Sequence, residues 1–402
     1  MSLQHLKVSF FLAVRGLLRG SRGSLYLSIL IIAMVFTNMI FMSSIIMGAI
    51  KNSERSIIEY QTGNILVEPK DNEQYIEDVS SLLDKLNRIP GVIRASAHYS
   101  MGATLKNEGN RVGGTVTAVR PDDERMVTGT WKKMKEGEYL SDGETGEVII
   151  GIQTSGHKDK NEDMGATLGY VRTGDPVTIE FTNGVTKEYR VKGIFETRSY
   201  QADMEVFVTW NEMESVLGHP IEDSTGLIIK TTPDLPEAQV KQTILRFGVQ
   251  EKVKTWQDLL EEAFGRAIQS FSIINSVTVI VSLVIAIVVL FIVIMIKTLN
   301  SRRQIGVLKA LGVEKSIIIN NYLFQVLLLT TAGTILGIGI VEGMVGLLTL
   351  YPIKFPDGDV TPYVTTMDLV TNTILLFIAA AIAGYIPAWR VASEDIMTAM
   401  RA

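Results

Sequence analysis

The sequence offers few side chains that could carry out a reaction. It contains no cysteine, which excludes disulfides, thiolate metal ligands and cysteine nucleophiles. The phosphate-binding pattern G-x-x-x-x-G-K-[ST] does not occur in these 402 residues. The four histidines are scattered and do not match metal-site spacings such as H-E-x-x-H: His5, His98, His157 and His219. We therefore predict no catalytic residue and no metal site.

A small set of polar side chains lies within long apolar stretches. Glu342 is the one acidic residue in such a stretch, where an ionisable group is costly and usually functional. It could bind a proton or contact a substrate, or it could lie near the outward-facing interface of the membrane with its carboxylate reaching water. Asn38, Asn275 and Asn372 could form hydrogen bonds between membrane helices.

Four charge-free segments, residues 25–50, 267–296, 316–341 and 369–389, are expected to be membrane helices; they contain the three asparagines, and Glu342 directly follows the third. At about 1.5 Å per residue in a helix, each segment can cross a hydrocarbon core of about 30 Å. We extend the third span to residue 350. The chain is 47% hydrophobic and 20% charged, whereas soluble domains carry about 25% charge. This composition excludes a soluble enzyme, a nucleic-acid-binding protein and a β-barrel.

The polar segment 51–266 between the first two spans has 26 basic and 36 acidic residues, a net charge of −10. Apolar residues at helical spacing predict a helix over 75–88, and alternating patterns predict strands over 92–106 and 111–119. Asn183-Gly184 is a strong hairpin signal. The predicted fold is a membrane α-helical protein with four transmembrane helices. A large α+β extracytoplasmic domain of two lobes, with helical stalks, lies between spans 1 and 2.

The basic residues predict the orientation in the membrane. Residues 1–24 carry four basic and no acidic side chains, and the loop 297–315 carries five basic residues against one acid. The tail 390–402 is expected on the same side, whereas the loop 351–368 is acidic. Because cytoplasmic loops are enriched in Lys and Arg, we expect both termini in the cytoplasm.

Residues 256–303 keep a helical spacing of apolar side chains from Leu259 into the second span. A continuous helix of this length would be about 70 Å long, with more than half of it in lipid. Such a rod could transmit displacement across the membrane. The alternative is an ordinary helix that breaks near Gly265.

The cytoplasmic segment 302–312 predicts a short amphipathic helix. Ile305, Leu308 and Leu311 fall on one face, Lys309 falls on another, and Gly312 stands where a helix-terminating glycine belongs. The helix could lie on anionic lipid or dock in a groove of a partner protein, because both modes use one amphipathic pattern.

Three motifs make the chain resemble the MacB/FtsX-type permeases of ABC transporters, which include the lipoprotein-releasing permeases. Residues 301–313, SRRQIGVLKALGV, are similar to the R-x-x-E-I-G-x-L-K-A-L-G segment of that family. Residues 333–339 are the glycine-rich part of the third span. Residues 385–401 are similar to a P-x-x-R-A-x-x-x-D-P-x-x-A-L-R ending. Gln304 and Ile396 depart from the usual Glu and Pro, and neither change removes the apolar face.

The resemblance implies partners. Two copies of a separate ABC ATPase, which would bind the ATP and Mg²⁺, are expected with a second permease copy in a homodimer or heterodimer. Leu3–Leu18 is similar to the family's interfacial amphipathic helix. The residues expected to couple the permease to the ATPase are Arg302, Arg303, Ile305, Val307, Leu308, Lys309, Leu311 and Gly312.

The function implied by the resemblance is that of a permease subunit in the cell membrane, which is not itself an enzyme and binds no cofactor of its own. ATP hydrolysis would move the extracytoplasmic domain and extrude an amphiphilic, peptide or lipid-anchored substrate. Candidate substrate contacts at the outer ends of spans 1 and 2 are Phe41, Ile45, Phe264, Ile268 and Phe271. The alternative is an FtsX-like mechanical relay that activates an extracellular or envelope partner without transport.

Overall fold

The computed structural model describes residues 3–18, 22–355 and 358–393, and these form two compact units. Of the described residues, the helical unit comprises 3–18, 22–49, 267–353 and 361–393, and the sheet unit comprises 50–266, 354–355 and 358–360. Parts of the predicted N-terminal segment 1–24, outer loop 351–368 and tail 390–402 lie outside the described residues, as do the final motif positions Asp395, Ala399 and Arg401.

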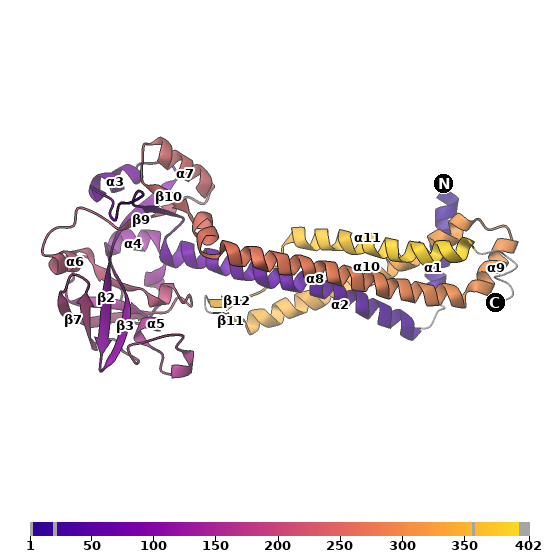
Figure 1. The fold of residues 1–402 in the computed structure, drawn as a ribbon, viewed down its shortest axis with the longest axis horizontal. Helices are drawn as coiled ribbons and strands as arrows, with labels where there is room; N and C mark the ends of the chain where they lie inside the picture. The colour runs from indigo at the N-terminus through magenta and orange to yellow at the C-terminus, as the bar shows by residue number, and fades with distance from the viewer. Residues whose placement is uncertain (1–2, 19–21, 356–357, 394–402) are drawn as a thin grey trace. The chain divides into compact units, whose positions relative to one another are not determined.

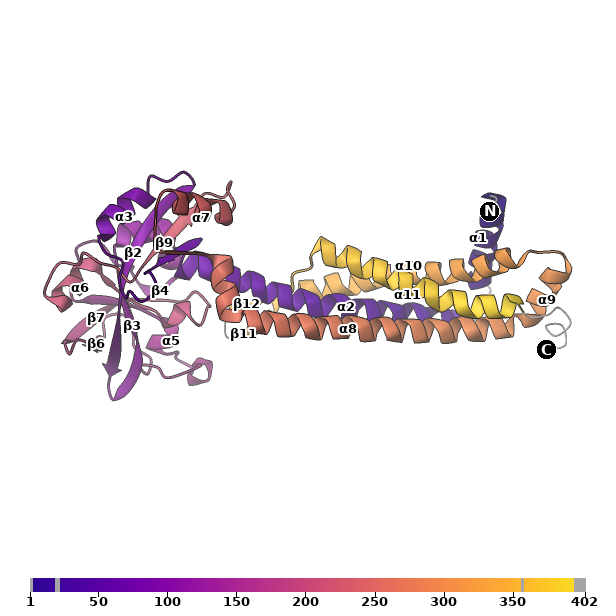
Figure 2. The same cartoon turned by 45° about the horizontal axis from the view of Figure 1, so that its top comes forward.

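The described chain contains four helices that are long and apolar enough to cross a membrane, which confirms the predicted four spans. Within the helical unit these helices run alongside one another, and α1 and α9 lie at the same end of the bundle (Figures 1 and 2). The helices that contribute to this unit are α1 (Leu3–Leu18), α2 (Arg22–Ser56), α8 (Trp256–Asn300), α9 (Arg302–Ala310), α10 (Lys315–Leu350) and α11 (Thr366–Ser393).

Helices α2 and α8 extend furthest beyond the predicted spans. Helix α2 continues past residue 50 to Ser56 and is followed by a π-helical turn, η1 (Ile57–Gln61). Helix α8 has 45 residues and remains helical through Gly265. At about 1.5 Å per residue it is about 70 Å long, so the prediction of a continuous helix is confirmed and the break near Gly265 is wrong.

Close contact between α2 and α10 depends on two glycines of the third span. A Cβ atom at Gly333 would lie 2.6 Å from Cγ2 of Ile32, and one at Gly337 would lie 2.9 Å from Cδ1 of Phe36. Gly339, by contrast, has no atom of the described residues within 4 Å of a Cβ position. Gly333 and Gly337 therefore serve packing within one chain.

The sheet unit is built on ten strands, in the order β10-β1-β9-β2-β3-β8-β5-β7-β4, with β6 pairing with β2 and β7. The strands are β1 (Ile65–Glu68), β2 (Val92–Asn107), β3 (Asn110–Val119), β4 (Met134–Gly137), β5 (Glu147–Gly151), β6 (Pro176–Phe181), β7 (Thr186–Phe195), β8 (Val206–Thr209), β9 (Gly226–Thr231) and β10 (Lys252–Thr255). Strands β11 (Ile353–Phe355) and β12 (Gly358–Val360) form a separate pair.

Short helices and turns accompany these strands, giving the predicted α+β class. They are α3 (Val79–Leu86), α4 (Pro121–Val127), α5 (Ile152–Ser155), α6 (Trp210–Leu217) and α7 (Glu237–Arg246), with 3-10 turns η2 (Thr130–Lys133), η3 (Lys160–Glu162) and η4 (Ala202–Met204). Helix α3 begins later than the predicted 75–88 because Ile76 forms a β-bridge with Ser224 and Asp78 adopts a left-handed conformation (φ +48°).

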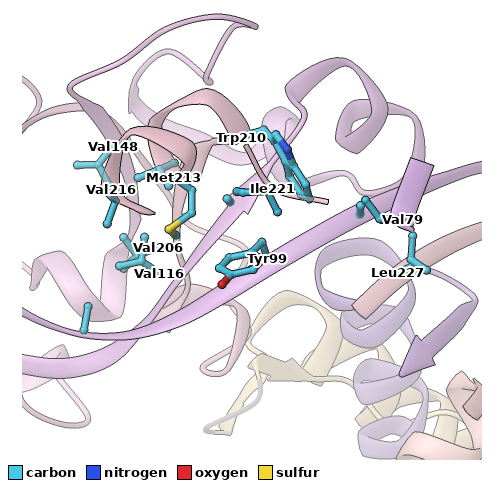
Figure 3. Packing of buried hydrophobic residues seen from close by; sticks show 14 of the residues in the cluster. Val79, Tyr99, Val116, Val148, Val206, Trp210, Met213, Val216, Ile221 and Leu227 are labelled. Atoms are coloured by element: carbon cyan, nitrogen blue, oxygen red, sulfur yellow. The ribbon is translucent and has the colours of Figure 1, made fainter. Parts of the chain in front are cut away.

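Strand β2 joins the two halves of this unit. Residues 92–98 pair with β9, and residues 99–107 pair with β3. One hydrophobic core also extends across both halves, including Val79 and Leu227 on one side and Val148 and Met213 on the other (Figure 3). The two halves are thus connected by a strand and a core, and their division into two lobes stays a prediction.

Helix α6 begins at a side-chain cap that we expect to contribute measurably to stability. Oγ1 of Thr209 accepts a hydrogen bond from the backbone N–H of Glu212 (3.2 Å) and donates one to the carbonyl oxygen of Glu144 (2.5 Å). Thr209→Ala should lower the free energy of unfolding by about 1–2 kcal/mol. Urea unfolding of the full chain in detergent, followed by tryptophan fluorescence, measures this loss. Thr209→Ser keeps the hydroxyl and should recover most of it.

Candidate functional site

Helix α9, between α8 and α10, presents a mixed apolar and basic surface. Val307 is 46% exposed and Leu311 is 76% exposed. Arg303 is also exposed, whereas Leu308 is half-buried. Exposed apolar side chains beside a cation form a candidate docking surface. We define Arg303, Val307 and Leu311 as the α9 face.

Ile305 does not belong to this face, which corrects the predicted grouping of Ile305 with Leu308 and Leu311. Its side chain is 3% exposed and packs in the core of the helical unit, which includes Ile294 and Ile318. A nine-residue helix that packs against its neighbours must bury one side, and Ile305 lies there. Arg302 and Lys309 are half-buried, and Gly312 ends the segment with φ +86°.

The predicted substrate residues are divided between the two units. Phe41 and Ile45 on α2 and Ile268 on α8 are half-buried in the helical unit. Phe271 on α8 is 46% exposed. Phe264 is half-buried and belongs to the sheet unit. Their role in substrate binding stays a prediction.

The predicted polar residues of the spans behave differently from one another. Ser282 of α8 donates a hydrogen bond to Oδ1 of Asn38 on α2 (3.0 Å), as expected for a contact between helices. Asn372 instead donates to the carbonyl oxygen of Asp368 on its own helix (2.9 Å). Oδ1 of Asn275 is buried without a hydrogen-bond partner in the described part of the chain. Glu342 is exposed on α10.

Gln325 is a buried polar residue that the sequence analysis did not single out. It is 2% exposed, and its Nε2 donates to Oδ1 of Asn321 one turn earlier on α10 (3.1 Å). A Cβ atom at Gly16 of α1 would lie 3.1 Å from this same Nε2. Its position in an apolar segment was the available signal, as it was for the asparagines.

The sheet unit contains a cavity of about 510 Å³ that the sequence analysis missed. Five cations line it: Arg55, Lys132, Lys133, Lys135 and Arg198. We call it the basic cavity. The run Trp131-Lys-Lys-Met-Lys135 was a visible sequence signal, but Arg55 and Arg198 are distant in the sequence and are brought to it by the fold.

A buried carboxylate holds one wall of the basic cavity. Asp203 accepts hydrogen bonds from the backbone N–H of Thr197 (2.7 Å), from Oγ1 of Thr197 (2.8 Å) and from the backbone N–H of Arg198 (3.0 Å). Burial raises the pKa of Asp203 to about 6, although these hydrogen bonds act in the opposite direction. The turn that carries Arg198 is therefore fixed from inside the unit.

Comparison with known proteins identifies the family. A family model described as a MacB-like periplasmic core domain matches residues 25–247, and one described as an FtsX-like permease C-terminal region matches residues 276–396. The two matches follow the order of the elements, with the sheet unit first and the later membrane helices second. The chain belongs to the MacB/FtsX-type permeases, and it is a multi-pass membrane protein with a large α+β extracytoplasmic domain between its first two spans.

The individual relatives share little sequence identity with this chain. The macrolide export ATP-binding/permease protein MacB of Acinetobacter baylyi is 21% identical over 332 residues, which cover 80% of this chain and 47% of MacB. The chain thus spans about half the length of that curated relative. The extracellular domain of the noncanonic ABC-type transporter YknZ from Gram-positive bacteria is 14% identical, with a TM-score of 0.33 over 48% of this chain and 97% of that domain. The periplasmic region of MacB from Actinobacillus actinomycetemcomitans is 10% identical, with a TM-score of 0.34 over 50% of this chain and 91% of that region.

Proposed function

We propose that this chain is the permease subunit of an ABC transporter. An ABC ATPase on a partner chain binds ATP and Mg²⁺, docks on the α9 face and drives movement of the extracytoplasmic domain. The transported substrate is an amphiphilic, peptide or lipid-anchored molecule. The proposal places both termini in the cytoplasm of a cell in which the protein spans the cytoplasmic membrane, and it pairs two permeases with two ATPases.

The observation that carries this proposal is the α9 face. Val307 and Leu311 expose apolar surface beside Arg303, at the end of the bundle where the amphipathic helix α1 also lies (Figure 2). The loop that contains α9 is strongly basic, which favours a cytoplasmic location where an ATPase is available. The continuous helix α8 leads directly into α9, so a force applied at α9 can act along α8.

The docking assignment predicts a specific loss of partner binding. In the double variant Val307→Glu/Leu311→Glu, two carboxylates would have to be buried in the interface with the ATPase. We expect at least a tenfold loss of affinity, since central apolar residues contribute most of the binding energy of an interface. The full chain is co-expressed with candidate ABC ATPases of the same genome. The co-purified ATPase and its rate of ATP hydrolysis are then measured.

Met164→Glu is the matched control, because it places a carboxylate at a 51% exposed apolar residue of the sheet unit. It should leave the complex intact. Equal complex formation by the double variant and the wild type would refute docking at α9. Stimulation of hydrolysis by a lipopeptide supports extrusion, whereas stimulation only by an extracellular hydrolase would favour the mechanical relay. Ile305→Glu is unsuitable for this test because Ile305 is buried within the permease itself.

A further inference from the structure

The basic cavity is assembled from separate parts of the sheet unit. Arg55 comes from the end of α2, Lys132 and Lys133 from η2, and Arg198 from the turn after β7. Its volume of about 510 Å³ lies in the range of small-molecule sites, about 300–1,000 Å³. Exposed cations surround a floor of buried polar side chains, in which Oγ of Ser56 is hydrogen-bonded to Oγ of Ser199 (2.6 Å).

The charges in this cavity are unbalanced. Arg55 pairs with Glu59 (3.0 Å), Lys135 with Glu196 (2.7 Å), and Arg198 with Asp359 (2.6 Å). Lys132 and Lys133 form no ion pair with a carboxylate of the described residues; Nζ of Lys132 lies 5.1 Å from the centroid of the Trp131 ring. The surrounding segment 51–266 has a net charge of −10. An excess of positive charge in one cavity of an acidic domain favours an anionic ligand.

The walls of the cavity are held in place before any ligand binds. The backbone N–H of Glu196 donates to the carbonyl oxygen of Lys133 (2.9 Å), which ties η2 to the turn after β7. Arg198 adopts φ +67°, a conformation that side-chain-bearing residues seldom adopt, and the hydrogen bonds to Asp203 maintain it. Strained backbone that the surrounding structure maintains is concentrated at binding and active sites.

The sequence places this cavity close to the end of the first apolar segment. Arg55 lies five residues after Ile50 on the same helix, α2, a distance of about 7.5 Å along the axis. We propose that the basic cavity is a binding site for a phosphate-bearing anion, held by Lys132 and Lys133 with Arg55 and Arg198. Ammonium and guanidinium groups are the usual partners of phosphate. As a statement about substrate class, the inference rests on the proposed permease function.

Calorimetric titration of the full chain in neutral maltoside micelles tests the proposal. The probes are dihexanoyl phosphatidic acid, dihexanoyl phosphatidylcholine and inorganic phosphate. We expect phosphatidic acid to bind and zwitterionic phosphatidylcholine to bind at least tenfold more weakly. Lys132→Gln/Lys133→Gln should weaken phosphatidic acid binding about tenfold, because charge-assisted hydrogen bonds are the strong ones. Tighter binding of phosphatidic acid than of inorganic phosphate assigns the site to an amphiphile headgroup, and equal binding assigns it to a soluble phosphate compound.

The matched control is Lys158→Gln/Lys160→Gln, which removes two exposed lysines from another loop of the sheet unit and should change binding less than twofold. No binding, equal loss in both double variants, or equal binding of phosphatidylcholine would overturn the proposal. The titration needs no ATPase. If the ATPase docks at α9 but no phosphate-bearing probe binds, only the cavity proposal is rejected. If the probe binds but no ATPase docks, only the permease assignment is rejected.

Discussion

Replacing Gly333 by leucine is expected to prevent correct packing of the membrane helices. A Cβ at this position would lie 2.6 Å from Cγ2 of Ile32 and 3.2 Å from the backbone oxygen of Ile29, so α2 and α10 would have to separate. Overpacking of a well-packed core costs about 1–3 kcal/mol, and a whole leucine side chain in a helix contact should reach the upper end. The expected result is a lower thermal midpoint and loss of monodisperse protein in size-exclusion chromatography.

Gly339→Leu is the control for this experiment. It makes the same substitution in the same helix, six residues further on, where no atom of the described chain lies within 4 Å of the Cβ position. Because leucine has a higher helix propensity than glycine, this variant should be as stable as the wild type or more so. Equal damage at both positions would mean that the two glycines share one packing role, contrary to the contact described here.

Glu124→Ala is expected to destabilise the sheet unit by about 3–5 kcal/mol, the usual cost of removing one partner of a buried pair. Glu124 is 2% exposed, and its carboxylate lies 2.9 Å from Nε2 of His98. It also accepts hydrogen bonds from Oγ of Ser96 (2.8 Å) and Oγ1 of Thr128 (3.0 Å). The substitution would leave all three groups without this partner. Urea unfolding of the full chain in detergent measures the loss.

The same pair predicts a pH dependence of stability. Burial opposes the charge on His98, but the Glu124 carboxylate outweighs it and raises the pKa of His98 above 6.5. Burial likewise opposes the charge on Glu124, yet His98 and the hydroxyl donors lower the pKa of Glu124 below 4.5. The contribution of His98 to the free energy of unfolding is present below pH 6.5 and is lost as the pH rises through the pKa of His98 in the folded protein. The contribution of Glu124 to the free energy of unfolding is present above pH 4.5 and is lost as the pH falls through the pKa of Glu124 in the folded protein.

The pair therefore stabilises the fold most between pH 4.5 and 6.5. In Glu124→Ala the loss of stability as the pH rises above 6.5 should disappear, since burial, the strongest influence on His98, opposes its charge and is then countered only by the weaker attraction of Glu205. Asp122→Ala removes an exposed carboxylate from the same helix, α4, and should cost less than about 1 kcal/mol while leaving the decrease above pH 6.5 unchanged. An unaltered profile in Glu124→Ala would contradict the assignment of this pH dependence to the pair.

The membrane helices were the most predictable part of the structure. Long charge-free segments have few alternatives to a transmembrane helix, and the uninterrupted apolar spacing after Leu259 correctly predicted α8. The hairpin of β2 and β3 was also predictable from alternating residues around the turn at 107–110. The start of α3 was not, because the β-bridge of Ile76 to Ser224 joins residues that are far apart in the sequence.

The candidate sites were less predictable because exposure is decided by tertiary contacts. Amphipathic spacing placed Ile305 beside Leu311, but the spacing does not reveal which side of α9 the other helices cover. The basic cavity has no continuous motif, since Arg55 and Arg198 are distant from Lys132 in the sequence and are brought near it only by the tertiary fold. The ionic pair of His98 and Glu124 was equally invisible, because each residue alone resembles a surface residue in the sequence.

The long strand β2 has a consequence for how the outer domain can move. Where β2 changes partner, Thr225 bridges the junction: its Oγ1 donates to the carbonyl oxygen of His98 (2.9 Å) and accepts from the backbone N–H of Ser100 (2.9 Å). These two hydrogen bonds restrict bending of the sheet at the junction. We therefore expect the sheet unit to behave as one body that does not hinge where β2 changes partner.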